Sequence, residues 1–455
     1  MAGKDVLLEP LLPSLAVKSA SQTKRESWME RVVLILLSTF AITTATYIWV
    51  LFNPKYTPDT AASLHKCAWS SLQTHVSLLS VPPITADEFL TRQQTLSSAL
   101  KSAGVDAFIA EPSASTAYLA NISSSYDLSE RPFLVILSAS GEASLLVPKF
   151  ETNRITALEM VFPDDQPNVI QWREEESPYT VLAQHTSFKK VMLDEHARYM
   201  IASGLQKNGI EVVPTSQEIQ ALRAVKSEAE LEILSGINEF TLELVRSLQS
   251  CIEIGMTQET IVDAASQLFA SAGIGKGFWS IVLFGEQAAN PHGGGVGRTL
   301  KNGEFVLVDI GSSLHSYGSD VTRTILPKKS KVNKELMDIW HLVHDAQTAA
   351  IGRMNINETC SVVDQVSRDV IEKKGYGEFF THRLGHGLGL EMHEHPYLNG
   401  VNGEKLKAGE VVTNEPASSM GKSKGFGVRI EDAILVTKKG GIPMTGARAK
   451  SPYEP

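Results

Sequence analysis

The sequence predicts an α+β protein with two globular domains and one N-terminal transmembrane helix, and three observations lead to this prediction. The chain has 455 residues, of which 43% are hydrophobic and 20% charged, so it can form two sizeable cores. From about residue 84 onward, strand-like and helix-like patterns follow one another. An uncharged stretch of bilayer length precedes them. The net charge of −9 argues against a nucleic-acid partner.

The uncharged stretch covers residues 32–52 and reads VVLILLSTFAITTATYIWVLF, long enough to cross a bilayer as a helix. The basic residues around it are Lys4, Lys18, Lys24, Arg25 and Arg31 before it, and Lys55 and Lys66 after it. The positive-inside bias predicts a single-pass type II membrane protein with a cytosolic tail over 1–31 and a lumenal or extracellular body. A cleaved signal peptide and a buried core helix are the alternatives, but the leader is long and the stretch is apolar on all sides.

Residues 53–83 are polar and serine-rich, which indicates a stalk, so a chain starting near Val81 is expected to keep the whole site. A lumenal body fits a glycoprotein with sequons at Asn121-Ile-Ser and Asn357-Glu-Thr. The three cysteines are Cys67, Cys251 and Cys360. An odd count implies no full disulfide framework, and Cys67 is left able to pair between the chains of a homodimer.

A smaller α/β domain is predicted over residues 84–218. EFLTRQQTLSSALKSAG has apolar residues at helical spacing with Gly104 as a stop, and strands follow in VDAFIA, FLVILS, ASLLVP, KKVMLDE and EVVPT. A long helix is expected over 216–248, at the junction with a second domain over 219–455. Its charged residues from Lys226 to Glu232 are expected on a solvated face.

Five residues of the second domain form a candidate metal-binding set. They are Asp309, Asp320, His386, Glu415 and Glu431, in the strings LVDIGSSLHSYGSDVTRT, LGHGLGLEMHEHP, VVTNEPA and GVRIEDAIL. Four carboxylates brought together in an apolar setting repel one another, by about 4 kcal/mol for each pair at contact distance and an effective dielectric of about 20. Two divalent cations would balance four negative charges. The pattern therefore indicates a two-metal hydrolase.

The strand period supports this interpretation. FVLVDIG and SDVTRTIL read as two strands joined by a glycine- and serine-rich connection, so Asp309 and Asp320 are expected side by side. In GVRIEDAIL the same period puts Arg429 and Glu431 on one face, where Arg429 can orient Glu431 or balance its charge. A solvent-facing strand end is the simpler interpretation of any single acid, but it does not account for all five.

The motifs NPHGG, DIG…SDVTRT, GHGLGLEMHEHP, NEP and GVRIED stand in this order along the chain. With them, the sequence from about Ile84 to about Lys439 resembles the prolidase and aminopeptidase P group of the methionine-aminopeptidase-like metallopeptidases. The resemblance implies a pita-bread catalytic domain preceded by a smaller, noncatalytic creatinase-like domain. It also implies hydrolysis of the bond between an N-terminal residue and a following proline, so the expected partner is a peptide with proline in second position.

The resemblance also implies a role for each matching residue. Asp309 would bind one metal, His386 and Glu415 the other, while Asp320 and Glu431 would bridge the pair. The other implied site residues are His292 and His393 for catalysis and His382 for the proline end of the substrate, and Arg429 is grouped with the substrate-binding residues. His395 is expected only at a polar rim. The hard, oxygen-rich ligands suit manganese, which the family suggests, and also cobalt or zinc.

Two departures from the family pattern leave alternatives open. Ala417 follows the NEP proline where relatives usually have glycine, and SSMGKSKG replaces a more apolar loop. A lyase branch that acts on dimethylsulfoniopropionate tends to carry an extra acid two positions after the first ligand Asp, where this chain has Gly311. Carbon–sulfur lyase activity and a non-catalytic, membrane-tethered binding protein are the alternatives to a peptidase.

Overall fold

The computed structural model describes residues 32–33, 36–37, 44 and 58–455, the last range without 124–125, 127–128, 156, 164–166, 294–296 and 421–425. Most of the stretch predicted to span a membrane, residues 32–52, therefore lies outside the described residues. Within the part that is described, no helix has both the length and the apolarity that a membrane crossing requires. The structure thus does not support the predicted single-pass type II membrane protein, and we do not retain that prediction.

The predicted stalk is wrong for most of its length. Helix α2 (Pro58–Leu72) and the 3-10 helix η1 (Gln73–Leu79) occupy it, and α2 packs on helices α9 and α10 of the second domain. Leu64, Ala68 and Leu72 are fully buried there because they recur every four residues and form one apolar face. The serine-rich composition of residues 53–83 had indicated a solvated stalk because the apolar face is only one residue in four.

A disulfide fixes α2 to the second domain. Cys67 of α2 is bonded to Cys251, at the end of α9, with an S–S distance of 2.06 Å and a sequence separation of 184 residues. The expectation that Cys67 pairs between two chains is therefore wrong. Cys360 is a buried free cysteine.

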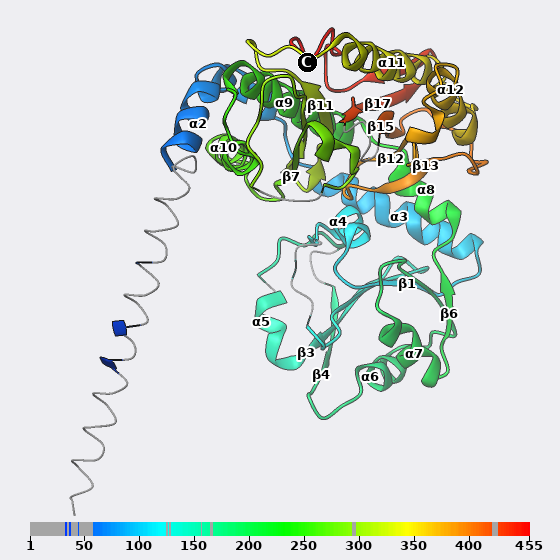
Figure 1. Ribbon diagram of the computed structural model, residues 1–455. Helices are drawn as coiled ribbons and strands as arrows, with labels where there is room; N and C mark the ends of the chain where they lie inside the picture. The colour runs from blue at the N-terminus through cyan, green and yellow to red at the C-terminus, as the bar shows by residue number, and fades with distance from the viewer. Residues whose placement is uncertain are drawn as a thin grey trace, which may run out of the picture. The chain divides into compact units, whose positions relative to one another are not determined.

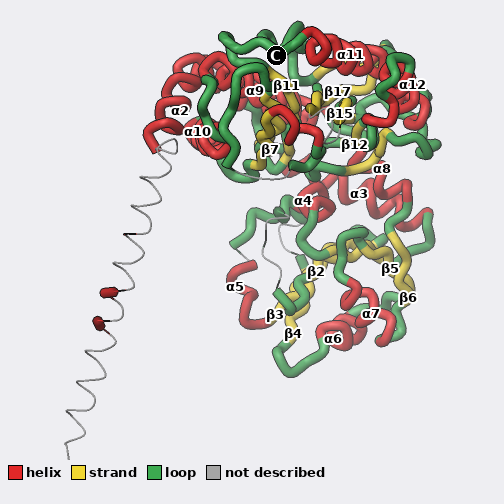
Figure 2. Tube along the Cα trace, in the orientation of Figure 1, coloured by secondary structure: helices red, strands yellow, loops and turns green. Residues whose placement is uncertain are grey.

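The N-terminal domain is built on a six-stranded sheet in the order β4-β3-β2-β1-β5-β6 (Figures 1 and 2). Its strands are β1 (Ala107–Ala110), β2 (Leu134–Ser138), β3 (Ala143–Pro148), β4 (Asn168–Trp172), β5 (Lys190–Leu193) and β6 (Glu211–Pro214). Its helices are α3 (Ala86–Ser102), α4 (Ala114–Ala120), α5 (Thr152–Ile155), α6 (Pro178–His185) and α7 (Tyr199–Lys207). Two apolar clusters bury the two faces of the sheet, as the run of continuous apolar strands predicts.

The junction between the domains is two helices and not one. Helix α8 (Gln217–Ala224) ends before Val225, and α9 (Glu228–Cys251) begins after Ser227. Ser227 is the N-cap of α9 and forms a capping box with Glu230. The predicted solvated face is wrong at Lys226 and Glu230, which are only 6% and 2% exposed. Both side chains have buried partners of opposite charge, as buried ions require.

The second domain holds two main sheets covered by helices. One has the order β11-β8-β7 and the other β13-β12-β14-β17-β18, and β15 pairs with β16 separately. The strands are β7 (Trp279–Phe284), β8 (Val306–Gly311), β9 (Ser313–Leu314), β10 (Tyr317–Gly318), β11 (Val321–Ile325), β12 (Gly385–Gly387), β13 (Glu394–Leu398), β14 (Val411–Asn414), β15 (Ala417–Met420), β16 (Phe426–Arg429), β17 (Asp432–Thr437) and β18 (Gly440–Pro443).

Two pairs of helices bury the outer faces of these sheets. Helices α9 and α10 (Gln258–Ser271) pack on the first sheet, and α11 (Lys334–Ile351) and α12 (Cys360–Glu372) pack on the second (Figure 1). The polar residues described below therefore lie on the inner side, where the two sheets approach.

Removal of residues 1–57 is expected to leave a folded protein, whereas removal of residues 1–80 is expected to lower the melting temperature strongly. The longer deletion removes α2, its disulfide and its buried leucines. Loss of one buried leucine side chain costs about 2–5 kcal/mol, and loss of a disulfide about 2–4 kcal/mol. Thermal unfolding followed by circular dichroism compares the two proteins. Equal melting temperatures would contradict the place of α2 in the core.

Candidate metal centre

Strands β8 and β11 bring the two aspartates together, as the strand period predicts. The strands pair antiparallel with Thr322 opposite Asp309 and Val321 opposite Ile310. Asp320 directly precedes β11, and the turn between the strands contains the short hairpin β9–β10. Asp309 and Asp320 are 5% and 4% exposed, so both carboxylates are buried.

The remaining three predicted ligands come from the second sheet and its connections. His386 lies in β12, Glu415 follows β14, and Glu431 lies between β16 and β17. The His386 Nε2 atom is 3.6 Å from Asp320 Oδ2 and 3.3 Å from Glu415 Oε1. Ligand atoms of Asp320, His386 and Glu431 all lie within 4.8 Å of one another. The structure therefore gathers residues from both sheets into one buried cluster.

The contacts of Arg429 differ from the prediction. GVRIEDAIL is not one strand, because β16 ends at Arg429 and β17 begins at Asp432 in another sheet. The Arg429 guanidinium donates to Asp309 Oδ2 and, at 3.1 Å each, to Thr322 Oγ1 and the Pro291 carbonyl. Arg429 thus holds the Asp309 carboxylate in place. Its hydrogen bonds indicate that it supports a predicted metal ligand rather than contacting a substrate.

Thr322 is a site residue whose role the sequence analysis did not identify. Its hydroxyl donates to Glu431 Oε2 at 2.5 Å, and its carbonyl accepts from the Glu431 N–H at 3.0 Å. The same hydroxyl accepts from Arg429. Its signal in the sequence was the alternation with Asp320, which puts both side chains on one face of the strand.

Burial and like charge dominate the electrostatics of this cluster. The pKa values of Asp320 and Glu431 are raised well above their usual range, first by desolvation and then by neighbouring carboxylates. Burial also acts on Glu415, but its hydrogen bond with His386 and the charge of that ring outweigh it and hold the pKa at about 2. The cluster therefore carries more negative charge than its protein partners balance.

The donor set fits divalent cations. Asp309 Oδ1 and Glu431 Oε1 are buried and have no hydrogen-bond partner among the residues that the structure describes. Such orphaned carboxylate oxygens are costly unless a cation binds them. Four carboxylates and one imidazole are ligands that manganese, cobalt and zinc accept. Asp309, Asp320, His386, Glu415 and Glu431 would hold the ions.

Comparison with known proteins agrees with this geometry. Residues 233–438 match metallopeptidase family M24, and residues 92–225 match the creatinase/prolidase N-terminal domain. An uncharacterized peptidase of Schizosaccharomyces pombe is 43% identical over 418 residues, which cover 88% of this chain and 90% of that relative. The chain belongs to metallopeptidase family M24. The predicted family, with a creatinase-like domain before a pita-bread metallopeptidase domain, is confirmed.

Solved structures show the same two domains. Dipeptidase PepE of Mycobacterium ulcerans superposes with a TM-score of 0.74 at 26% identity, covering 80% of this chain and 98% of that chain. A prolidase of Thermococcus sibiricus superposes with a TM-score of 0.70 at 27% identity, covering 79% and 97%. These structural neighbours support the conclusion that the chain is a peptidase.

Three predicted histidines lie near the five predicted ligands. The ring of His393 is 4.2 Å from that of His386, centroid to centroid, and is exposed on its other side. Burial and the charge of His386 lower the pKa of His393 to about 4, with a smaller contribution from His292. His292 follows Pro291, whose carbonyl binds Arg429. His382 binds the Arg383 carbonyl through Nδ1 at 2.7 Å, while its Nε2 is buried without a partner in the described part of the chain.

A cavity of about 310 Å³ is lined in part by His292, and none of the five predicted ligands is among its described lining residues. Val262 of α10 and Ile281 and Leu283 of β7 give it apolar walls. Ile281 pairs directly with Asp309 across β7 and β8, so their side chains share one face of the sheet. The cavity therefore lies along the edge strand β7, beside the strand that carries Asp309, and has room for an apolar side chain.

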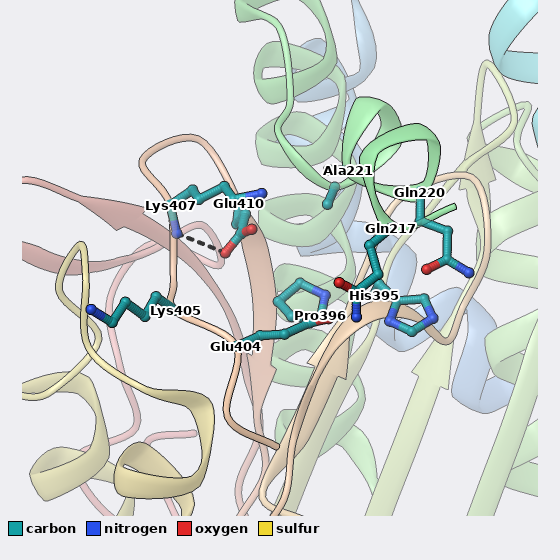
Figure 3. A pocket seen from close by; sticks show the side chains of 10 residues that line it. Gln217, Gln220, Ala221, His395, Pro396, Glu404, Lys405, Lys407 and Glu410 are labelled. Atoms are coloured by element: carbon teal, nitrogen blue, oxygen red, sulfur yellow. Dashed lines mark hydrogen bonds between the residues drawn. The ribbon is translucent and has the colours of Figure 1, made fainter. Parts of the chain in front are cut away.

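A second cavity, of about 210 Å³, lies between α8 and β13 (Figure 3). Gln217 and Gln220 of α8 and His395 and Pro396 of β13 line it. The five predicted metal ligands are not among its described lining residues, so this cavity is not the candidate metal centre. His395 accordingly lies apart from the ligand set.

Without metal, the protein is expected to lose stability as the pH rises from about 4. Asp320 and Glu431 have higher pKa values folded than unfolded, so the folded state binds more protons in this window and the free energy of unfolding falls until the pH passes the raised values. The lowered pKa of Glu415 adds a contribution that is constant there, because that stability is lost only at lower pH.

Melting temperatures in a chelator from about pH 5 to about pH 8 check this linkage. Asp320→Asn should flatten the decline, because an amide removes one buried charge. Asp338→Asn, at an exposed carboxylate paired with Lys334, is the control and should leave the decline unchanged. If the melting temperatures of the wild type and Asp320→Asn fell equally with pH, repulsion among the buried carboxylates would be contradicted.

Proposed function

We propose that this M24 protein is a two-metal hydrolase that removes the N-terminal residue from peptides with proline in second position. The observation that carries the proposal is the buried cluster of Asp309, Asp320, His386, Glu415 and Glu431 with its orphaned oxygens. Two bound divalent cations would supply an activated water and stabilise the charge that develops during hydrolysis. Manganese is the expected metal, and cobalt and zinc also suit the ligands.

The histidines around the cluster suit the proton transfers that hydrolysis needs. A lowered pKa keeps His393 neutral near pH 7, and a neutral imidazole donates from one ring nitrogen and accepts at the other. His393 can thus donate to the substrate carbonyl oxygen or to the leaving proline nitrogen, and His292 is the second candidate for this role. The unpaired Nε2 of His382 offers a polar contact for the proline end.

Proline in second position is a reason for a dedicated enzyme. Its ring fixes φ and removes the N–H that extended substrates normally donate. The cavity beside His292, lined by Val262, Ile281 and Leu283 and also by Glu259 and Asp263, would receive the side chain of the N-terminal residue. Solved relatives at similar identity include the Thermococcus sibiricus prolidase and a Xaa-Pro dipeptidase of Bacillus anthracis, the latter 26% identical. These names support the proposal by analogy.

Carbon–sulfur lyase activity finds no support at Gly311. A Cβ at this position would overlap the Ser319 carbonyl oxygen and the Trp279 indole, so the extra acid of the lyase branch has no space here. A non-catalytic binding protein would have no need for the complete ligand set with its unfavourable charge. Both alternatives predict no cleavage of proline peptides.

Metal analysis and substrate assays on the same preparation test the proposal. About two metals per chain are expected, with release of the first residue from Xaa-Pro dipeptides or Xaa-Pro-Yaa peptides and no product from dimethylsulfoniopropionate. A protein that binds no metal, or binds metal and cleaves no proline peptide, would refute it.

Asp320→Ala and Glu431→Ala are each expected to abolish peptide cleavage and to lower the metal content. Each change removes an oxygen ligand expected to be shared by both ions, so neither ion keeps its position. Inductively coupled plasma mass spectrometry gives the stoichiometry, and release of proline gives the turnover. Wild-type turnover in either variant would exclude the bridging role.

His292→Ala and His393→Ala are expected to keep both metals while turnover falls by about 10²-fold, the size of a general-acid or electrostatic contribution. His386→Ala should instead weaken metal binding, because it removes the imidazole nitrogen from the ligand set. Stoichiometry and turnover are measured for the same three variants. Metal loss in His292→Ala with metal retention in His386→Ala would reverse the two roles.

A further inference from the structure

A second cluster of metal-type ligands lies where the N-terminal domain meets the loop before β13. Glu195 and His196 follow β5, and Glu391 belongs to the loop that leads to His393. One ligand atom from each of Glu195, His196 and Glu391 lies within 4.8 Å of the others. The His196 Nε2 atom is 3.2 Å from Glu391 Oε1. Glu195 and His196 are exposed and Glu391 is half-buried, so solvent ions can reach the cluster.

Neighbouring side chains orient these three ligands. Arg223 donates to Glu391 Oε2, which leaves Oε1 toward His196. Gln220 Nε2 donates to Glu195 Oε2 at 3.0 Å. Each carboxylate is thus held through one oxygen by a side chain of α8. Such outer contacts are typical of metal sites, where they fix the geometry of the ligands.

The Asp194 carboxylate lies beside His196. Asp194 is buried, with only 4% of its surface exposed, and its Oδ1 accepts the backbone N–H of His196 at 3.0 Å. The same Oδ1 lies 3.8 Å from His196 Nδ1, the ring nitrogen that faces away from Glu391. Oδ2 is buried with no hydrogen-bond partner within the described chain. Asp194 thus holds the His196 backbone by a hydrogen bond and places a carboxylate beside the ring, which favours a cation there.

The charges of the cluster leave room for a divalent cation. Its carboxylates are Asp194, Glu195, Glu391 and Glu394. Two cations oppose them, since Arg223 pairs with Glu391 and Glu394, and Lys226 Nζ lies 2.5 Å from Glu394 Oε1. Four carboxylates against two cations leave two negative charges in excess. One divalent ion would neutralise them.

We propose that Glu195, His196 and Glu391 bind one zinc ion at this domain junction, separate from the candidate metal centre. One imidazole and two carboxylates with an open position for water match the ligands that zinc takes in proteins. The ion would tie the N-terminal domain to the loop that carries His393, two residues after Glu391. Zinc binding here is independent of the proposed peptidase function.

Isothermal titration calorimetry of the full chain with zinc chloride tests the site without any activity readout. The wild type, His196→Ala and His185→Ala are titrated after removal of metal. His185 is an exposed histidine of the same domain whose Nδ1 contacts the Val181 carbonyl of its own helix. His196→Ala should bind one zinc fewer than the wild type, while His185→Ala should match the wild type.

Asp194→Asn gives a second measurement, with zinc binding to this site expected to weaken by about tenfold or more because the support of His196 is lost. Equal zinc stoichiometry in wild type and His196→Ala would overturn the proposal. A zinc loss in His185→Ala as large as in His196→Ala would also overturn it, by indicating nonspecific surface binding. The difference between variants does not depend on the ions held by Asp320 and Glu431, so failure here is distinct from failure of the peptidase proposal.

Discussion

The burial of four carboxylates around His386 is the constraint on which the rest of the second domain depends. Asp309, Asp320 and Glu431 are nearly inaccessible to water, and Arg429 is the cation that pairs directly with one of them. The guanidinium of Arg429 and the ring of His386, whose pKa is raised by Glu415 and Asp320 against the effect of burial, do not balance four carboxylates, and protonation of the acids relieves the remaining repulsion in the absence of metal. Bound cations would therefore stabilise the site, whereas repulsion among the carboxylates destabilises it without them. This is the physical reason to assign it to divalent cations.

Two sheets must meet for the cluster to exist at all. The aspartates come from β8 and β11, and the histidine and the glutamates come from β12, the end of β14 and the passage from β16 to β17. Thr322 joins the halves, because its hydroxyl and its carbonyl both bind Glu431 while it pairs with Asp309 across the strands. Helices on the outer faces hold the sheets in place by apolar burial. Precision at the ligands thus rests on packing outside them.

The junction between the two domains reaches the loop of His393 through buried ion pairs. Lys226 and Arg223 both bind Glu394, which lies one residue after His393. Glu394 is fully buried, and its two cations outweigh the effect of burial so that its pKa is lowered. Removing either cation would leave a buried charge without compensation, which is expensive. The junction, although it contributes none of the five predicted ligands, therefore helps to place a proposed catalytic residue.

The sequence by itself determined the ligand types, their order and the strands that carry them, because strand period and local motifs are short-range properties. It placed Asp309 and Asp320 side by side correctly. It did not determine that Cys67 bonds to Cys251, that residues 58–79 belong to the core, or that Lys226 is buried against Glu394. Each of these facts joins segments that are more than a hundred residues apart. The composition of a segment does not show which distant residues its side chains contact. Only the tertiary structure therefore decided whether a charged side chain is solvated or paired, and whether a serine-rich helix is exposed or packed.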